Sequence, residues 1–124
     1  MSEKKIIAVV DDDESVRESL PDLLESFGFA VRTYASADAF LTSGDSDPLG
    51  CMILDVAMPG MSGPQLQQEL IRQNRNVPIV FITAHSDDSA WPALLNSGAV
   101  ACLVKPFSES AIVDAVRKAL AREP

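Results

Sequence analysis

The chain of 124 residues is poor in the side chains that bind zinc or build disulfide frameworks, because it contains one histidine and two cysteines. Cys51 and Cys102 both lie in apolar, strand-like segments, so we interpret them as small buried hydrophobic side chains. A disulfide framework would need another cysteine pattern and another cellular compartment. Two isolated cysteines without histidine neighbours also argue against a metal site built on them.

Basic residues are few as well. Ten lysines and arginines stand against eighteen aspartates and glutamates, which gives a net charge of −8 and an isoelectric point near 4.4. Nucleic-acid binding needs a basic face, so this balance argues against direct contact with nucleic acid, and it disfavours anionic membranes. It fits a protein that handles a cation or meets a basic partner.

Long apolar runs are missing too. No run approaches the ~18 residues that a membrane span needs. Lys4 and Lys5 near the start are not followed by a signal-length apolar stretch. We therefore expect a cytoplasmic protein without a membrane segment. The length and the 47% hydrophobic content predict a single domain over residues 1–124 with one sizeable interior.

What the chain does contain is a regular alternation of five short apolar runs with five amphipathic stretches. The runs cover residues 6–10, 30–34, 51–54, 79–83 and 100–104. Four of them are continuously apolar, as strands covered on both faces should be, and the second is more polar, which suits an edge. This order predicts an α/β fold, a single open parallel sheet with helices on both faces and right-handed crossovers.

The amphipathic stretches carry apolar residues at helical spacing. The expected inner faces are Val16, Leu20, Leu23, Leu24 and Phe27 in the first helix, Phe40 and Leu41 in the second, Leu66, Leu70 and Ile71 in the third, Leu94 and Leu95 in the fourth, and Ile112, Val113, Val116 and Leu120 in the fifth. Ser36, Ser62 and Ser108 are the expected N-caps of the second, third and fifth helices. Gly28 marks the end of the first helix, and Pro21 inside it predicts a kink.

Polar residues follow four of the predicted strands, and ligands of such sheets bind outside the carboxyl ends of the strands. The residues are Asp11, Asp12 and Asp13 after the first strand, Asp55 after the third, Thr83 at the end of the fourth and Lys105 after the fifth. Crowded carboxylates repel one another, and a hard cation such as Mg²⁺ removes that cost. A carboxylate can also attack phosphorus, with cations and hydroxyl groups stabilising the transferred group. Each residue alone has an ordinary structural explanation, in a helix start, a turn, a strand or the surface; their combination favours phosphoryl chemistry.

Four segments carry a resemblance to a known family over essentially the whole chain. They are Val9-Val10-Asp11-Asp12-Asp13, Ile53-Leu54-Asp55-Val56-Ala57-Met58-Pro59-Gly60-Met61-Ser62-Gly63, Ile82-Thr83-Ala84 and Val104-Lys105-Pro106-Phe107. In this order they resemble the receiver domains of bacterial two-component response regulators. The segments Gly28-Phe29-Ala30-Val31 and Ser36-Ala37 are most similar to the FixJ-type subgroup. The resemblance implies a flavodoxin-like receiver fold with strand order 2-1-3-4-5 and five helices.

The resemblance also implies a metal site and a phosphoacceptor. Asp55 would accept the phosphoryl group. Asp12 and Asp55 would ligate Mg²⁺ directly, for which Mn²⁺ can substitute, together with the backbone carbonyl of Ala57. Asp11 would orient a metal-bound water.

The same resemblance assigns the residues of a switch. Lys105 would pair with Asp55 and then with the phosphoryl group, and its peptide bond to Pro106 would be cis. Thr83 would swing to bond a phosphoryl oxygen, and Gly63 would give the loop after Asp55 room to turn. The family implies an aspartyl phosphate that forms and slowly hydrolyses on the domain itself, not an enzyme that acts on foreign substrates.

Three positions depart from the family pattern or vary within it. Many receivers carry an aromatic residue three positions before the lysine, where this chain has Cys102, which cannot act as a bulky rotor. Ala57 has no side chain that could position a water for dephosphorylation. His85 either positions such a water or is simply exposed.

The implied partners follow from the family. A sensor histidine kinase would donate the phosphoryl group, and phosphorylation would favour a homodimer through the fourth helix, the fifth strand and the fifth helix. FixJ-type regulators usually continue into a DNA-binding helix-turn-helix, whereas this chain ends at Glu123-Pro124. We expect either a stand-alone receiver or, with a modest preference, a part of a longer transcription regulator.

Other protein classes are less consistent with the residues. A phosphatase of the haloacid dehalogenase type would carry a second aspartate two residues after the nucleophile, where Ala57 stands. A flavodoxin-like cofactor binder would need a Ser/Thr/Gly-rich phosphate loop where this chain has its acidic run 11–14. A degenerate receiver that only binds proteins stays open as an alternative, and the modification of Asp55 is what separates the two.

Overall fold

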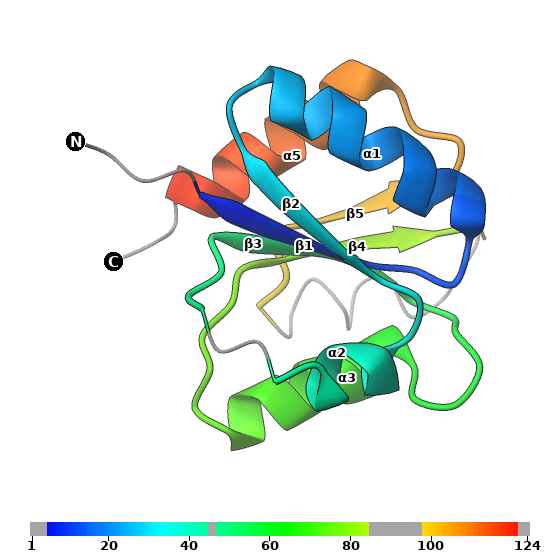
Figure 1. The fold of residues 1–124 in the computed structure, drawn as a ribbon, viewed down its shortest axis with the longest axis vertical. Coiled ribbons are helices and arrows are strands. Elements are labelled where there is room, and N and C mark those ends of the chain that lie inside the picture. The colour runs from blue at the N-terminus through cyan, green and yellow to red at the C-terminus, as the bar shows by residue number, and fades with distance from the viewer. Residues whose placement is uncertain (1–4, 45–46, 85–97, 122–124) are drawn as a thin grey trace.

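A computed structural model describes residues 5–44, 47–84 and 98–121, and these residues form one five-stranded parallel sheet between two layers of helices (Figure 1). The strands are β1 (Ile6–Val10), β2 (Ala30–Tyr34), β3 (Cys51–Asp55), β4 (Ile79–Thr83) and β5 (Ala101–Val104). The helices are α1 (Glu14–Ser26), α2 (Ala37–Thr42), α3 (Gly63–Arg72) and α5 (Glu109–Ala121). The strand order is β2-β1-β3-β4-β5, which confirms the predicted doubly wound topology.

The strands agree closely with the prediction. β1, β2 and β4 have the predicted limits, β3 is longer by Asp55, and β5 begins at Ala101 instead of residue 100. The more polar β2 lies at an edge, as its sequence indicated. The predicted fourth helix, with Leu94 and Leu95, lies outside the described residues.

Side chains alternate along each strand and fill two cores, one on each face of the sheet. Ile7 and Val9 of β1 belong to the core under α1 and α5, whereas Ala8 and Val10 belong to the core over α2 and α3. β3 and β4 are buried along their whole length. Burial on both faces is the reason why their sequences are continuously apolar.

The two cysteines lie on opposite faces of the sheet and are not joined in a disulfide. Cys51 is fully buried in the core under α1 and α5, which confirms its predicted role. Cys102 in β5 packs against the other core and is only half-buried, so the same prediction holds for it in part.

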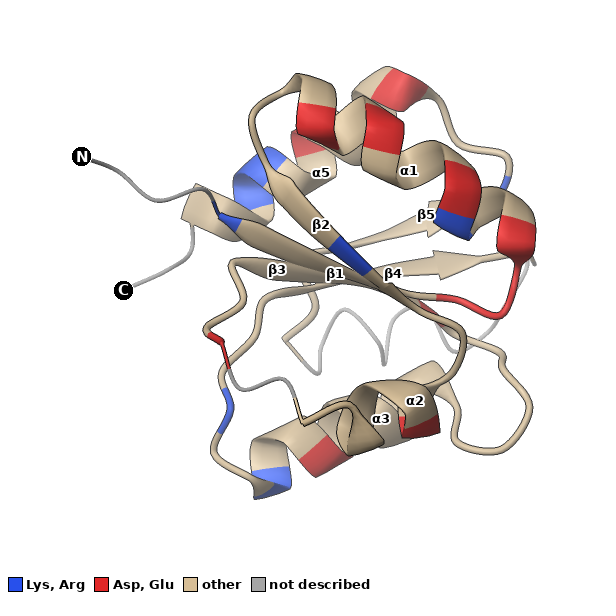
Figure 2. Ribbon diagram, viewed as in Figure 1, with Lys and Arg blue, Asp and Glu red and all other residues tan. Residues whose placement is uncertain are grey.

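Helix α1 is capped at both ends, and acidic residues lie along it (Figure 2). The Asp13 carboxylate accepts a hydrogen bond from the Ser15 amide at the start, and Gly28, with φ +93°, ends the helix as predicted. The helix runs through Pro21 without interruption. Phe27 was predicted on the inner face, and this is wrong: it is the C-cap residue, beyond the last helical turn, and is 47% exposed.

Helix α3 begins with a capping box, since Ser62 Oγ accepts from the Gln65 amide and Gln65 Oε1 accepts from the Ser62 amide. The predicted inner position of Ile71 is wrong, because its side chain is 52% exposed. Gln67 takes the third buried place next to Leu70 instead. Helical geometry explains the difference, because residue 71 is one position past the stripe on which residues 63, 66, 67 and 70 lie.

The other two predicted N-caps are confirmed. Ser36 Oγ accepts from the Ala39 amide at 3.0 Å in α2, and Ser108 Oγ accepts from the Ala111 amide at 3.1 Å in α5. Each cap satisfies an amide that has no partner inside its own helix.

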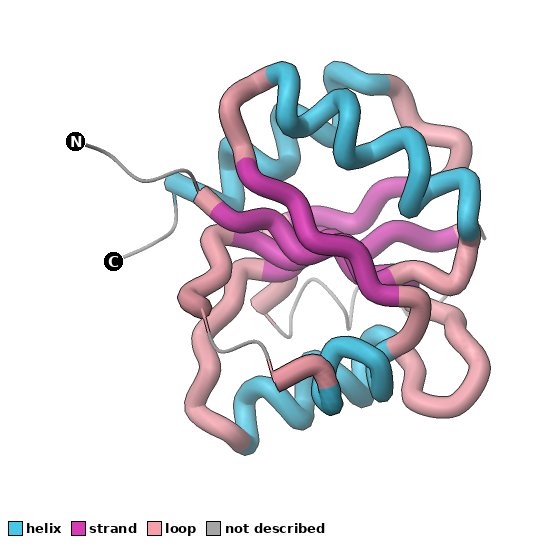
Figure 3. Tube along the Cα trace, viewed as in Figure 1, coloured by secondary structure: helices cyan, strands magenta, loops and turns pink. Residues whose placement is uncertain are grey.

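All five strands run in the same direction, so their carboxyl ends meet at one edge of the sheet, on the right in Figure 3. The loops after β1, β3, β4 and β5 leave from this edge, and it is the predicted location of the polar residues. Among the described helices none combines the length and the apolar character needed to cross a bilayer.

Candidate functional site

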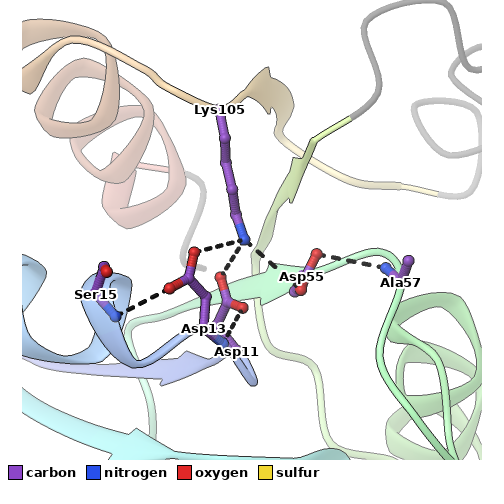
Figure 4. Close-up of polar contacts among 6 residues, drawn as sticks. All are labelled: Asp11, Asp13, Ser15, Asp55, Ala57 and Lys105. Carbon is purple, nitrogen blue, oxygen red and sulfur yellow. Dashed lines mark hydrogen bonds and ion pairs between the residues drawn. The ribbon is translucent and has the colours of Figure 1, made fainter.

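The structure brings the acidic residues and the lysine together at the carboxyl edge of the sheet (Figure 4). Asp55 is the last residue of β3, and Asp11 follows β1, its neighbour in the sheet. Asp11, Asp55 and Thr83 are buried, whereas Asp12 is exposed. Parallel pairing of adjacent strands is therefore what turns residues far apart in sequence into one cluster.

The loop after β1 is organised by its own aspartates. The Asp13 amide donates to Asp11 Oδ1 at 2.9 Å, and the Ser15 amide donates to Asp13 Oδ1 at 2.9 Å. The first bond fixes the direction of the buried Asp11 side chain, and the second starts α1. The acidic run thus starts helix α1 and also orients a carboxylate of the site.

Lys105 points from the end of β5 into the acidic cluster (Figure 4). Its amide donates to the Thr83 carbonyl oxygen at 2.8 Å, which ties the lysine to β4, and the predicted cis bond to Pro106 is confirmed. The ammonium nitrogen lies 2.9 Å from Asp11 Oδ2, 3.7 Å from Asp55 Oδ2 and 3.8 Å from Asp13 Oδ2.

The expected pairing of Lys105 with Asp55 is therefore present, but it is not the closest one. Asp11 attracts the ammonium most strongly because its carboxylate is fully buried and cannot be hydrated. Within the part of the chain that the structure describes, Asp11 Oδ2 has no hydrogen-bond partner of suitable geometry, so its contact with the Lys105 ammonium is ionic.

Burial and charge make Asp55 an unusual carboxyl group. Desolvation, a side-chain contact with Asp11 and the Asp11 charge raise the pKa of Asp55 from 3.8 to about 7, against the opposing effects of Lys105 and the Ala57 amide. For Lys105, burial opposes the charge, but the contacts with the three carboxylates outweigh burial and raise the pKa above its ordinary value. The nucleophile candidate is therefore held close to its protonation midpoint at neutral pH, beside a fully charged ammonium.

The cluster also fits a divalent cation. Asp11, Asp12 and Asp55 each offer a carboxylate oxygen, and these three oxygens lie within 4.8 Å of one another. Oxygen donors of this kind suit Mg²⁺, which often uses one or two carboxylates and keeps several waters. Asp11 Oδ2 supports the fit because, apart from its ionic contact with Lys105, it makes no hydrogen bond among the described residues and so has acceptor capacity left for a cation or its water.

The loop after Asp55 is held against the end of β3. The Ala57 amide lies 3.4 Å from Asp55 Oδ1, and the Ala57 side chain is exposed. The Gly63 amide donates to the Val56 carbonyl oxygen at 3.0 Å, which closes the loop onto α3.

Of the remaining predicted site residues, two lie in described strands and one does not. Thr83 is buried at the end of β4, on the strand next to Asp55, as predicted. Cys102 pairs with Phe81 in the sheet and is half-buried. His85 lies outside the described residues. The contact of Asp13 with Lys105 was not predicted, although the position of Asp13 in the acidic run was the available signal.

Comparison with known proteins assigns the family. The sequence model of the response regulator receiver domain matches residues 7–117. Transcriptional regulatory protein FixJ of Azorhizobium caulinodans is 43% identical over 122 residues, which cover 98% of this chain and 58% of that protein. Nodulation protein W of Bradyrhizobium diazoefficiens is also 43% identical over 122 residues, with 98% and 54% covered.

Solved structures give the same result. The response regulator StyR superimposes with a TM-score of 0.88 at 45% identity, over 96% of this chain and 60% of that chain. FixJ-N superimposes with a TM-score of 0.88 at 34% identity, over 99% of this chain and 98% of that chain. The chain thus spans between half and two thirds of the length of the curated relatives named above. Because the family match covers nearly all of its residues, the chain belongs to the receiver domains of response regulators, with FixJ-type regulators among its relatives.

Proposed function

We propose that this receiver is a phosphorylation switch of a two-component system, in which Asp55 accepts a phosphoryl group from a partner histidine kinase with the help of Mg²⁺. The observation that carries the proposal is the position of Asp55. Its carboxylate sits at the end of β3, grouped with those of Asp11 and Asp12 and 3.7 Å from the Lys105 ammonium. A nucleophile, a cation-binding group and a fixed positive charge are what phosphoryl transfer requires.

The proposed reaction is an in-line displacement at phosphorus. A carboxylate oxygen of Asp55 forms the new O–P bond, while the P–N bond of the kinase phosphohistidine breaks and its electron pair returns to the imidazole nitrogen. Only ionised Asp55 can attack, and in the metal-free protein its pKa of about 7 leaves a substantial share of the carboxyl protonated at neutral pH. Lys105 offsets the negative charge that gathers on the phosphoryl oxygens.

Asp12, Asp55 and the Ala57 carbonyl would hold the cation directly, and Asp11 would hold it through a water. When bound, Mg²⁺ neutralises the clustered carboxylates and stabilises charge on the phosphoryl oxygens. Mn²⁺ would serve in the same place, because it also prefers oxygen ligands. Asp12 is exposed and therefore accessible from solvent, whereas the buried Asp11 can position a water inside the site.

The proposed switch begins at Thr83 and Lys105. A phosphoryl group on Asp55 adds roughly −1.5 to −2 charge and new acceptor oxygens. The Thr83 hydroxyl, at the end of the neighbouring strand, and the Lys105 ammonium are the donors that would close on these oxygens and bias the domain toward its active surface. Cys102 is too small to fill space as a rotating aromatic ring would, so the output surface would either respond less or respond through the loop after Thr83.

The partners and the location follow from this function. A sensor histidine kinase would dock near α1 and the acidic edge, and the phosphorylated domain would dimerise through the fourth helix, β5 and α5. A DNA-binding output domain would act in a longer chain, as in the transcription regulators that this chain resembles. The cytoplasmic location stays a prediction from sequence.

Intact mass spectrometry tests the proposal. The protein is incubated with acetyl phosphate or phosphoramidate, with Mg²⁺ and with excess chelator. We expect one added phosphoryl group in the presence of the metal and none in Asp55→Asn. A protein that never gains mass under these conditions would be a degenerate receiver that works only by binding partners.

A further inference from the structure

Asp13 uses its two carboxylate oxygens for two different purposes. Oδ1 accepts the hydrogen bond from the Ser15 amide at 2.9 Å and so caps α1. Oδ2 lies 3.8 Å from the Lys105 ammonium nitrogen (Figure 4). An ordinary N-cap residue would need only the first contact, which a serine or an asparagine makes equally well.

We propose that Asp13 is a positioning residue for phosphoryl transfer, and that its charge draws the Lys105 ammonium away from the buried carboxylates toward the outer rim of the site, where the phosphodonor arrives. The inference rests on the proposed function of Asp55. It assigns Asp13 a role separate from the metal ligands and from the helix start.

The depth of the three carboxylates around Lys105 supports this role. The side chains of Asp11 and Asp55 are 0% and 7% exposed and form the floor of the site, whereas the Asp13 side chain is 43% exposed and stands at its rim. The Lys105 side chain is 18% exposed, and its ammonium lies between the floor and the rim. Without Asp13, the attractions that remain draw Lys105 toward the floor.

The loop geometry makes the position of Asp13 precise. Its amide donates to Asp11 Oδ1 and its carboxylate is fixed by the Ser15 amide, so the backbone and the side chain of Asp13 are both held. A lysine side chain, in contrast, is a flexible stem with a compact charge, and its placement depends on the groups around it. Asp13 therefore has a fixed position, and the position of the Lys105 ammonium depends on it.

The expected size of the effect follows from the distance. Two unit charges about 4 Å apart in water shift an equilibrium roughly fivefold, and partial burial increases this factor. We expect the loss of the Asp13 charge to lower the phosphorylation rate about three- to tenfold.

Asp13→Asn separates the two roles, because asparagine keeps the capping oxygen but loses the charge. Asp13→Ala loses both. Ser36→Ala is the matched control, since Ser36 caps α2 through the Ala39 amide and does not contact Lys105.

The experiment measures the rate of phosphorylation by acetyl phosphate at saturating Mg²⁺, together with the melting temperature. Asp13→Asn should melt close to the unchanged protein and react about three- to tenfold more slowly. Ser36→Ala should melt roughly 4 °C lower and react at the unchanged rate. Asp13→Ala should show both losses. An unchanged or faster rate in Asp13→Asn, or rates that follow the melting temperatures, would overturn the proposal.

A spectroscopic measurement keeps the inference independent of the phosphorylation assay. At fixed pH, the Lys105 Cε resonance should move in Asp13→Asn and stay in place in Ser36→Ala. If the unchanged protein were not phosphorylated at all, the proposed function would fail, and this resonance would still report whether Asp13 holds Lys105. A resonance that does not move in Asp13→Asn contradicts the contact itself.

Discussion

The backbone of Gly63 packs directly against the backbone of Asp55. A Cβ atom at position 63 would clash with the Asp55 carbonyl oxygen and lie 3.1 Å from both the Asp55 carbonyl carbon and the Val56 Cα. The first residue of α3 therefore touches the residue that we propose as the phosphoacceptor. Because glycine has no Cβ atom, the two backbones can come into contact here. This is the room to turn that the sequence predicted for the loop after Asp55.

Gly63→Ala should lower the free energy of unfolding by roughly 2–3 kcal/mol, because the new methyl group meets backbone that cannot rotate away. Gly50→Ala is the control. Its Cβ would lie 2.6 Å from Leu120 Cδ2, the end of a flexible side chain near the end of α5, so we expect a loss of less than about 1 kcal/mol. Urea unfolding measures both, and equal losses in the two variants would contradict the packing of Gly63 on Asp55.

The stability of the metal-free protein should fall as the pH rises from about 4 to about 7. In this range an unfolded Asp55, with a pKa of 3.8, releases its proton, whereas the folded protein, with a pKa of about 7, keeps it. The difference is worth roughly 2–4 kcal/mol, fully present below the unfolded value and lost above the folded value. Urea unfolding at pH 5 and pH 8 should show a decrease in the unchanged protein that exceeds the decrease in Asp55→Asn by roughly two thirds of this amount, because part of the loss occurs below pH 5. The same decrease in both proteins would exclude Asp55 as its source.

Mg²⁺ should stabilise the folded protein at pH 8, since it relieves the repulsion among the clustered carboxylates. A concentration of about 100 times the dissociation constant adds about 2.7 kcal/mol, or several degrees in melting temperature. Asp12→Asn should lose most of this shift without a loss of stability in the absence of metal, because Asp12 is exposed. Asp22→Asn, which neutralises an exposed acid in the second half of α1, should keep the shift. A full shift in Asp12→Asn would remove that residue from the metal site.

Thr83 should connect phosphorylation to the output surface. In Thr83→Ala we expect phosphorylation of Asp55 to continue and the phosphorylation-induced homodimer to be lost, whereas Thr83→Ser keeps the hydroxyl and the dimer. Light scattering before and after treatment with the phosphodonor measures the mass. An unchanged mass for the phosphorylated, unmutated protein would argue against the dimer, and a dimer of phosphorylated Thr83→Ala would argue against the role of the hydroxyl.

Most of the fold could be predicted from the sequence because each signal is local. Four of the five strands are continuous apolar runs, and a serine or a glycine marks several of the helix ends. The errors occurred where a local pattern allows more than one solution. Ile71 extends the apolar pattern of α3, but only the packed helix shows that Gln67 takes the buried place. Phe27 continues the spacing of α1 beyond the point where the helix ends.

The composition of the site could also be predicted, because the ends of parallel strands meet at one edge. The distances inside it could not, since they depend on side chains from strands far apart in sequence. Sequence indicated a pair between Lys105 and Asp55, and the structure places the ammonium closer to Asp11. The difference in burial between Asp11 and Asp12, adjacent in the chain, likewise appears only when β1 is placed in the sheet.

The central claim is tested most directly by locating the phosphoryl group. The protein is phosphorylated by acetyl phosphate with Mg²⁺, reduced with borohydride, which converts an aspartyl phosphate to homoserine, and digested for peptide mapping. The account predicts homoserine at position 55 only, formed with Mg²⁺ and absent after chelation. A phosphoryl group on another residue, or none on Asp55 when the metal is present, would contradict it.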